Sequence, residues 1–195
     1  MGRIGKDKSE IITCAMKIMS KKGLSSLRLS DVAESMEMKT PSLYNHFKGL
    51  EDLIRAVQLR TNELLYEYMA EASKDLKGKE AFKALCHAYR NFFKKHTGIY
   101  ETMTIAIHAT DKELLQATFK PVDLVTKILK SVKMDADFGV HIMRFIRCSL
   151  HGFVSLESKG NMILKTSADE SFEVLVDMLI KGVWSKAKVT KKAKS

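Results

Sequence analysis

Two short groups of apolar residues stand out in the hydrophobic pattern near the N-terminus. Within each group the spacing is three or four residues, which predicts a helix. A polar segment, 37–39, separates them. Two helices of about two turns each, joined by a tight turn, indicate a helix-turn-helix. The apolar positions are Leu29, Val32, Ala33 and Met36 in the first group, and Leu43, Tyr44 and Phe47 in the second.

The second short helix is expected to begin near Thr40. Thr40 can cap it, and Pro41 suits the first helical position because its missing N–H has no partner there in any case. The free face of this helix then carries small or polar groups that can reach base edges and phosphates from the major groove. These groups are Lys39, Thr40, Ser42, Asn45 and His46.

A first helix is expected over 9–22, with Gly23 just past its end to supply a left-handed cap. Its apolar face is formed by Ile11, Ile12, Ala15, Ile18 and Met19. Leu24 and Leu27 follow, and we expect them to close a three-helix core against Ile18, Val32 and Phe47.

Long helical patterns fill the rest of the chain. One helix over 50–76 passes from the first module into the body without a break, and another covers 80–96. The segment 110–113 reads as a capping box before a helix that Pro121 should kink or split. The last two helices are expected over 135–158 and after a second capping box at 167–170. The pattern predicts an all-α fold.

The last two helices carry more apolar positions than one buried stripe requires. Such a wide apolar face on two antiparallel helices is typical of a four-helix dimer interface. The interface residues we predict are Phe153, Leu156, Phe172, Leu175, Met178 and Leu179.

The formal charge of +10 is concentrated at the two ends of the 195-residue chain. Residues 1–60 hold 11 Lys and Arg against 7 Asp and Glu, residues 61–180 hold 16 against 16, and residues 181–195 hold 6 against none. A basic first module on a neutral body fits a nucleic-acid reader joined to a different kind of domain. We expect the tail 186–195 to be a solvated, disordered end.

Three cysteines, Cys14, Cys86 and Cys148, lie far apart and in no metal-ligand spacing, so buried free thiols in a reducing cytoplasm are expected. No stretch has the ~18 apolar residues of a membrane span. Cys148 and His151 stand three residues apart on one helical face, so metal binding by them, His108 or His141 was considered. Without a second pair of ligands nearby in the sequence, we do not favour it. Cys86 and the next residue, His87, cannot pair as nucleophile and base because neighbours on a helix point about 100° apart. We predict no enzyme, no cofactor and no metal.

The segments 31–33 (DVA) and 42–53 (SLYNHFKGLEDL), with the helix end at Gly23, resemble the TetR family of bacterial transcriptional regulators. The resemblance implies that the second short helix and its flanks contact operator DNA. Phe47 is assigned to core packing, whereas Tyr44 is expected to pack its ring and offer its hydroxyl to a phosphate. The DNA-binding residues are then Arg28, Lys39, Thr40, Pro41, Ser42, Tyr44, Asn45, His46 and Lys48.

Three positions depart from the family pattern. Glu37 stands where a turn glycine is usual, so a left-handed backbone there would carry strain. Arg28 replaces the usual Ser or Thr cap and adds a cation for a phosphate. Leu50 replaces a Lys, which leaves phosphate binding to Lys48 and to backbone N–H groups near Gly49.

The segment from Arg147 to Gly160, with GFVSLE at its centre, is similar to the signature of the WHG-type C-terminal domain of one TetR subgroup. The similarity implies that the last two helices dimerise. Two-fold symmetry would then place two reading helices about 34 Å apart.

The resemblance implies a helix-turn-helix DNA-binding domain, 1–48, and a larger helical domain for effector binding and dimerisation, 49–185. An effector pocket among the middle helices would hold a small, mostly apolar ligand. Its candidate residues are Tyr89, Phe93, Tyr100, Met103, Ile107, Phe119, His141 and Phe145. For any one of these residues, ordinary core filling is the more frequent role.

These observations predict a cytoplasmic, homodimeric repressor that binds double-stranded operator DNA and is released from it by a small-molecule effector. Within the same fold, an activator or a redox sensor acting through the cysteines is the alternative. A helical small-molecule carrier would need the same pocket but not the basic first module.

Overall fold

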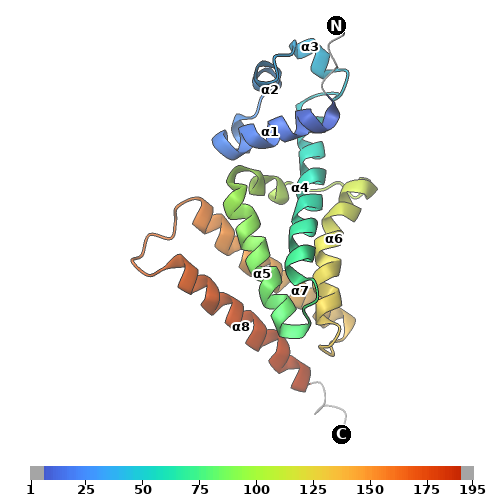
Figure 1. The fold of residues 1–195 in the computed structure, drawn as a ribbon. Helices are drawn as coiled ribbons and strands as arrows, with labels where there is room; N and C mark the ends of the chain where they lie inside the picture. Colours follow the sequence, from blue (N-terminus) through green and yellow to red (C-terminus); the bar gives the residue numbers. More distant parts are fainter. Residues whose placement is uncertain (1–6, 190–195) are drawn as a thin grey trace. The chain divides into compact units, whose positions relative to one another are not determined.

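The computed structural model describes residues 7–189, with side chains through Ser185. Every element in this part of the chain is a helix, which confirms the predicted all-α fold (Figure 1). The elements are α1 (Lys8–Lys22), η1 (Leu24–Ser26), α2 (Leu29–Ser35), α3 (Thr40–Leu43), α4 (Leu50–Ser73), α5 (Gly78–Lys95), η2 (Thr97–Thr104), α6 (Lys112–Leu129), α7 (Ala136–Ser158) and α8 (Ala168–Val189), where η marks a 3₁₀ helix.

The chain forms two compact units. The first joins the helix-turn-helix to the start of α4, to η2 and to the start of α6, and it covers 7–64 and 96–118 of the described residues. The second covers 65–95 and 119–189. The unit that contains the helix-turn-helix therefore extends past residue 48, where we placed the end of the DNA-binding domain.

A capping box that we did not predict begins α1 one residue early. The Asp7 carboxylate accepts a hydrogen bond from the Glu10 backbone N–H at 2.7 Å, and the Glu10 side chain accepts one from the Asp7 N–H at 3.0 Å. The helix ends as predicted at Gly23, whose φ of 79° is readily available only to glycine.

The helix-turn-helix has the expected core, with α1 packed on α2 and α2 packed on α3. Leu27 and Phe47 are buried as predicted, but Ile18 and Leu24 are half-buried. The buried positions of α1 are instead Ile11, Ala15, Met16 and Met19. Three of the five predicted α1 positions are therefore buried, and Met16 is buried where Ile12 and Ile18 were expected.

The second short helix differs from the prediction. α3 has only four residues, and i to i−3 hydrogen bonds from Tyr44 to Pro41 and from His46 to Leu43 continue it as tight turns. Thr40 does not cap it, because Lys39 occupies the cap position and no side chain accepts a hydrogen bond there. The turn before it keeps the left-handed backbone, with Glu37 at a φ of 53°.

Polar caps fix the later helices. Asp135 caps α7 through the Phe138 N–H at 2.8 Å, as predicted, and Ser167 caps α8 through the Asp169 N–H at 3.2 Å. At α6 the cap is Asp111 and not Thr110, because the Asp111 carboxylate accepts from the Leu114 N–H at 3.1 Å. Pro121 does not split α6, which runs through it as one helix.

Helix α8 continues to Val189, so the first four residues of the predicted disordered tail are helical. Residues 190–195 lie outside the described part of the chain. Across that described part, none of the helices combines the length and the hydropathy needed to cross a bilayer.

Candidate nucleic-acid interface

The surface predicted to contact DNA is formed by α3 and the turns on either side of it. Leu43 and Phe47 are buried beneath it and fix its orientation. The Tyr44 side chain is 58% exposed, so its ring lies largely in solvent and does not pack as expected. Of the other residues predicted to bind DNA, Arg28 at the start of α2 is exposed, as are Lys39, Pro41, Asn45 and Lys48, while Thr40, Ser42 and His46 are half-buried.

The exposed cations on this surface are suited to phosphate binding. Arg28 occupies the N-cap position of α2 without making a capping hydrogen bond, as expected from its side chain. The backbone N–H of Lys48 is not a free phosphate donor, because it donates to the Asp52 carboxylate at 3.0 Å. The Lys48 ammonium group is exposed and has the charge that phosphate binding requires.

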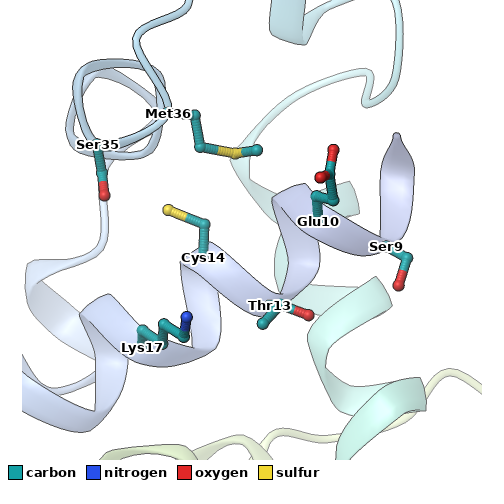
Figure 2. Close-up of a pocket in the computed structure, with 7 residues that line it drawn as sticks. All are labelled: Ser9, Glu10, Thr13, Cys14, Lys17, Ser35 and Met36. Atoms are coloured by element: carbon teal, nitrogen blue, oxygen red, sulfur yellow. The ribbon is translucent and has the colours of Figure 1, made fainter. Parts of the chain in front are cut away.

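A hollow of about 380 Å³ lies on the same unit, between α1 and the end of α2. Figure 2 shows the side chains of Cys14 and Met36 pointing into it from the two helices. Its lining residues are Ser9, Glu10, Thr13, Cys14, Lys17, Ser35 and Met36. None of these residues belongs to the predicted effector pocket.

The segment η2 packs against α1 and η1 of the helix-turn-helix. This contact was not predicted from the sequence. A Cβ atom added at Gly98 would lie 1.7 Å from the carbonyl oxygen of Met19, so the two backbones are in direct contact. The Glu101 carboxylate accepts a hydrogen bond from the Leu24 N–H at 3.1 Å. η2 thus holds the C-terminal end of α1 and the η1 turn that follows.

The same segment is tied to α4. The side-chain amide of Gln58 donates to the backbone carbonyl of Thr102 at 3.0 Å, and both residues are buried. Helix α4 and η2 therefore form one support for the helix-turn-helix within the first unit.

An ion pair joins α4 to the start of α6. The Arg55 guanidinium donates to both Asp111 carboxylate oxygens, at 2.5 and 2.7 Å, and to Glu113 at 2.8 Å. The hydrogen bonds from Arg55, with that from the Leu114 N–H, lower the pKa of Asp111 to about 2. The hydrogen bonds to Asp111 and Glu113 raise the pKa of Arg55. Asp111 is ionised at neutral pH and serves both the ion pair and the helix cap.

The predicted effector residues are divided between the two units. Tyr100, Met103 and Ile107 belong to the first unit, where Tyr100 is buried and the other two are half-buried. In the second unit, Tyr89 and Phe93 are brought together edge to face, with ring centroids 5.0 Å apart. The remaining three, Phe119, His141 and Phe145, are exposed.

Buried polar residues of α4 were missed by the sequence analysis. Gln58, Thr61 and Asn62 are all buried, and they interrupt the apolar face of the helix at three- and four-residue spacing. Polar residues inside an apolar helical stripe are the signal that could have identified them.

The predicted dimer residues fall into two groups. Phe153, Phe172 and Leu179 are buried within the second unit, and the first two pack edge to face at 5.0 Å between centroids. Leu156 is 50% exposed, Met178 is 66% exposed and Leu175 is half-buried. Two further exposed apolar residues, Phe145 on α7 and Val174 on α8, were not assigned to the interface.

An ion-pair network centred on the buried Arg90 joins α5 to the end of α7 and the start of α8. The Arg90 guanidinium donates to Glu157 and forms an ion pair with Asp169 at 2.7 Å. It also lies over the ring of Phe172, 4.8 Å from the centroid. Glu157 is the last residue of the GFVSLE segment, and its carboxylate is bound by Arg90.

The cysteines differ in environment. Cys86 is buried as predicted, and burial raises the pKa of its thiol to about 12. Cys148 is exposed and Cys14 is half-buried, so the expectation of buried thiols is wrong for these two. The Tyr89 hydroxyl and the Nδ1 atom of His151 share a hydrogen bond of 3.0 Å. Between residues 7 and 189, no group of three or more His, Cys, Asp or Glu side chains is arranged to hold a metal ion.

Family comparisons match both parts of the chain. Residues 11–57 match the model described as "Bacterial regulatory proteins, tetR family", and residues 82–179 match that described as "Tetracyclin repressor-like, C-terminal domain". The second match contains the whole segment from Arg147 to Gly160.

Two relatives are similar along most of their length. The HTH-type transcriptional regulator YobS of Bacillus subtilis is 29% identical over 93% of this chain and 94% of its own. The HTH-type transcriptional regulator Rv0681 of Mycobacterium tuberculosis is 30% identical over 80% of this chain and 72% of its own.

Solved structures share the fold at lower identity. Apo ActR from Streptomyces coelicolor superposes with a TM-score of 0.75 at 15% identity, over 97% of this chain and all of its own. A TetR variant from Acinetobacter baumannii AYE, in complex with minocycline, has a TM-score of 0.71 at 17% identity, over 94% of this chain and 99% of its own.

Proposed function

Because the chain belongs to the TetR family of bacterial transcriptional regulators, we propose that it is a homodimeric repressor released from its operator by a small, mostly apolar ligand. The observation that carries the DNA-binding part is the α3 surface. Exposed Tyr44, Lys39 and Lys48 stand over the buried side chains of Leu43 and Phe47. A rigid base below polar and cationic groups is what reading a DNA groove requires.

The proposed dimer uses the exposed apolar side chains of α7 and α8. Leu156 and Met178 are its centre, and Phe145 and Val174 extend it. Phe153, Phe172 and Leu179 support the face from within the unit. In a two-fold symmetric dimer, the two α3 helices would bind the two half-sites of a pseudo-palindromic operator. The centres of these half-sites would be one DNA turn, ~34 Å, apart.

Effector binding would weaken DNA binding by favouring a conformation that fits the operator poorly. The size of the effect is set only by the difference in effector affinity between the two conformations. The minocycline complex of the TetR variant from Acinetobacter baumannii supports an effector role for this fold. A repressor of this kind would compete with RNA polymerase for its site.

The deciding experiment is a gel shift of the purified protein with the DNA upstream of its own gene, repeated at several salt concentrations. We expect retardation at low salt that falls steeply as salt rises, because phosphate contacts release counterions. A scrambled duplex of equal length is the control for non-specific binding. The absence of retardation at low salt contradicts the proposal.

Two alternatives give different results. An activator would bind the same DNA but raise transcription in a reconstituted assay, and a redox sensor would lose binding on oxidation. Burial of Cys86, with its raised thiol pKa, disfavours that residue as a sensor, since the thiolate is the reactive form. A helical small-molecule carrier would bind ligand and leave the duplex unretarded.

A further inference from the structure

The hollow between α1 and the end of α2 brings two sulfur-containing side chains together. Cys14 enters it from the middle of α1, and Met36 enters it from the C-cap position of α2. Figure 2 shows both side chains directed into the hollow, with their sulfur atoms in yellow. The two helices pack on each other within the first unit, so the two side chains are held by elements in direct contact.

Met36 is a buried residue whose side chain nevertheless borders this opening. It is only 9% exposed, and its backbone is fixed because its N–H donates to the Val32 carbonyl at 3.1 Å. Its side chain is flexible and its thioether sulfur is polarizable, so the sulfur can adjust to a ligand while the backbone stays in place. Thiolate and thioether sulfur are the ligands that select copper(I) in proteins.

The Cys14 thiol differs from the other two thiols in its surroundings. Cys86 is 1% exposed and closed to solvent, and Cys148 is exposed on α7. Cys14 is half-buried and lines a space of about 380 Å³, which is large enough for an ion and its remaining water. A metal ion can therefore reach Cys14 and still be partly enclosed by protein.

We propose that Cys14 and Met36 bind a copper(I) ion in this hollow, with the Cys14 thiolate and the Met36 thioether as its two protein ligands. The Cys14 thiol releases its proton to solvent as the copper–sulfur bond forms. The charges of thiolate and copper(I) then cancel, which removes the main cost of enclosing an ion. The sequence did not predict this site, because its two ligands lie on different helices.

The groups around the hollow disfavour other metal ions. Zinc prefers four ligands in a tetrahedron, and between residues 7 and 189 no three His, Cys, Asp or Glu side chains are arranged to share an ion. Glu10 lines the hollow, but its carboxylate already accepts from the Asp7 N–H at 3.0 Å. The Lys17 ammonium group lies at the same opening, and its charge repels a divalent ion more strongly than a monovalent one.

The test uses the full-length protein carrying Cys148→Ser, because the exposed Cys148 thiol would bind copper(I) on its own. Copper(I) is titrated without oxygen in competition with the chromogenic chelator bicinchoninate. We expect one copper(I) ion per chain to be removed from the chelator. Cys14→Ser should weaken this binding by about 100-fold or more, since it removes the thiolate.

Met36→Leu tests the second ligand, because leucine keeps the volume and the apolar character of methionine but has no sulfur. This variant should bind copper(I) about 10-fold more weakly or worse. Met16→Leu is the matched control. Met16 is also 9% exposed and lies on α1 near Cys14, but it does not line the hollow. It should keep the affinity of the parent protein.

Methionine labelled with ¹³C at its methyl group reports on the thioether directly. The Met36 methyl resonance is identified as the one missing from the spectrum of Met36→Leu, and that of Met16 is identified in the same way. One equivalent of copper(I) should shift the Met36 resonance and leave the Met16 resonance in place. A merely structural role of Met36 would produce no such shift.

The inference is overturned if Cys14→Ser keeps the copper(I) affinity, if Met36→Leu binds as tightly as Met16→Leu, or if the Met36 methyl resonance does not move. The last two results would mean that Cys14 binds the ion without Met36. None of these measurements contains DNA, so their outcome is independent of whether the protein is a repressor.

Discussion

The backbone of Gly98 in η2 lies directly against the backbone of Met19 in α1, so that a Cβ atom on Gly98 would sit 1.7 Å from the Met19 carbonyl oxygen. The Cα atom of Ser20 would also be too close, at 2.6 Å from the same position. Glycine is therefore required here by the close approach of two main chains. This contact joins the helix-turn-helix to the segment that also holds α4 through Gln58.

Gly98→Ala should destabilise the protein by about 1–3 kcal/mol, since the obstacle is backbone that cannot rotate away. Urea unfolding of the variant and the wild type measures the change in free energy of unfolding. The control is Gly139→Ala in α7, where an added Cβ meets nothing within 4 Å and alanine favours the helix. Equal stability of Gly98→Ala and wild type would show that the two backbones are not in contact.

The ion pair of Arg55 and Asp111 predicts a particular dependence of stability on pH. The folded protein lowers the pKa of Asp111 to about 2 from an ordinary value near 4. The ionised carboxylate therefore adds stability above pH ~4, and this contribution is lost as the pH falls from ~4 toward 2. Asp111→Asn keeps a side-chain acceptor for the helix cap but has no such charge.

Unfolding of wild type and Asp111→Asn by urea should accordingly be compared from pH 7 to pH 2. We expect the wild type to be more stable at pH 7 and the difference to shrink below pH 4. Arg55→Gln should show the same shrinking difference. A difference that stays constant with pH would mean that the Asp111 charge does not contribute.

Local patterns in the sequence were sufficient to predict the helix-turn-helix. The buried positions Val32, Leu43 and Phe47 recur at helical spacing, and the ends at Gly23 and Asp135 follow from backbone and capping chemistry within a few residues. Such features need no knowledge of the rest of the fold.

Contacts between distant segments could not be predicted in the same way. Glu101 and Leu24 are 77 residues apart, and nothing in either segment indicates that they pair. Apolar periodicity also does not distinguish a core residue from an interface residue, which is why Phe172 was grouped with Met178 although only the latter is exposed. The unpartnered amide oxygen of Asn62 likewise becomes visible only once its neighbours are known.

Tyr44→Ala should abolish retardation of operator DNA and leave the fold intact. The side chain is 58% exposed, so its loss should change the free energy of unfolding by no more than about 0.5 kcal/mol. Tyr44→Phe separates the ring from the hydroxyl. If the hydroxyl donates to a phosphate, this variant should bind about 10- to 100-fold more weakly, as expected for one charge-assisted hydrogen bond. Unchanged operator affinity in Tyr44→Ala would remove Tyr44 from the interface.

Met178→Glu should weaken the proposed dimer while leaving each protomer folded. Met178 is 66% exposed in a single chain, so a carboxylate there remains in water until two chains associate through α7 and α8. Association would then bury two like charges in an apolar face, and the dimer dissociation constant should rise by at least about tenfold. Sedimentation equilibrium over a range of concentrations measures this change. Operator affinity should fall in parallel, because a monomer reads only one half-site.

The matched control for Met178→Glu is Ile163→Glu, which introduces the same charge at an 84% exposed residue between α7 and α8. We expect this variant to keep the wild-type association constant, since Ile163 lies outside α7 and α8, whose exposed apolar side chains form the proposed interface. Equal weakening by both variants would point to a general effect of charge. No weakening by Met178→Glu would place the dimer interface on another face.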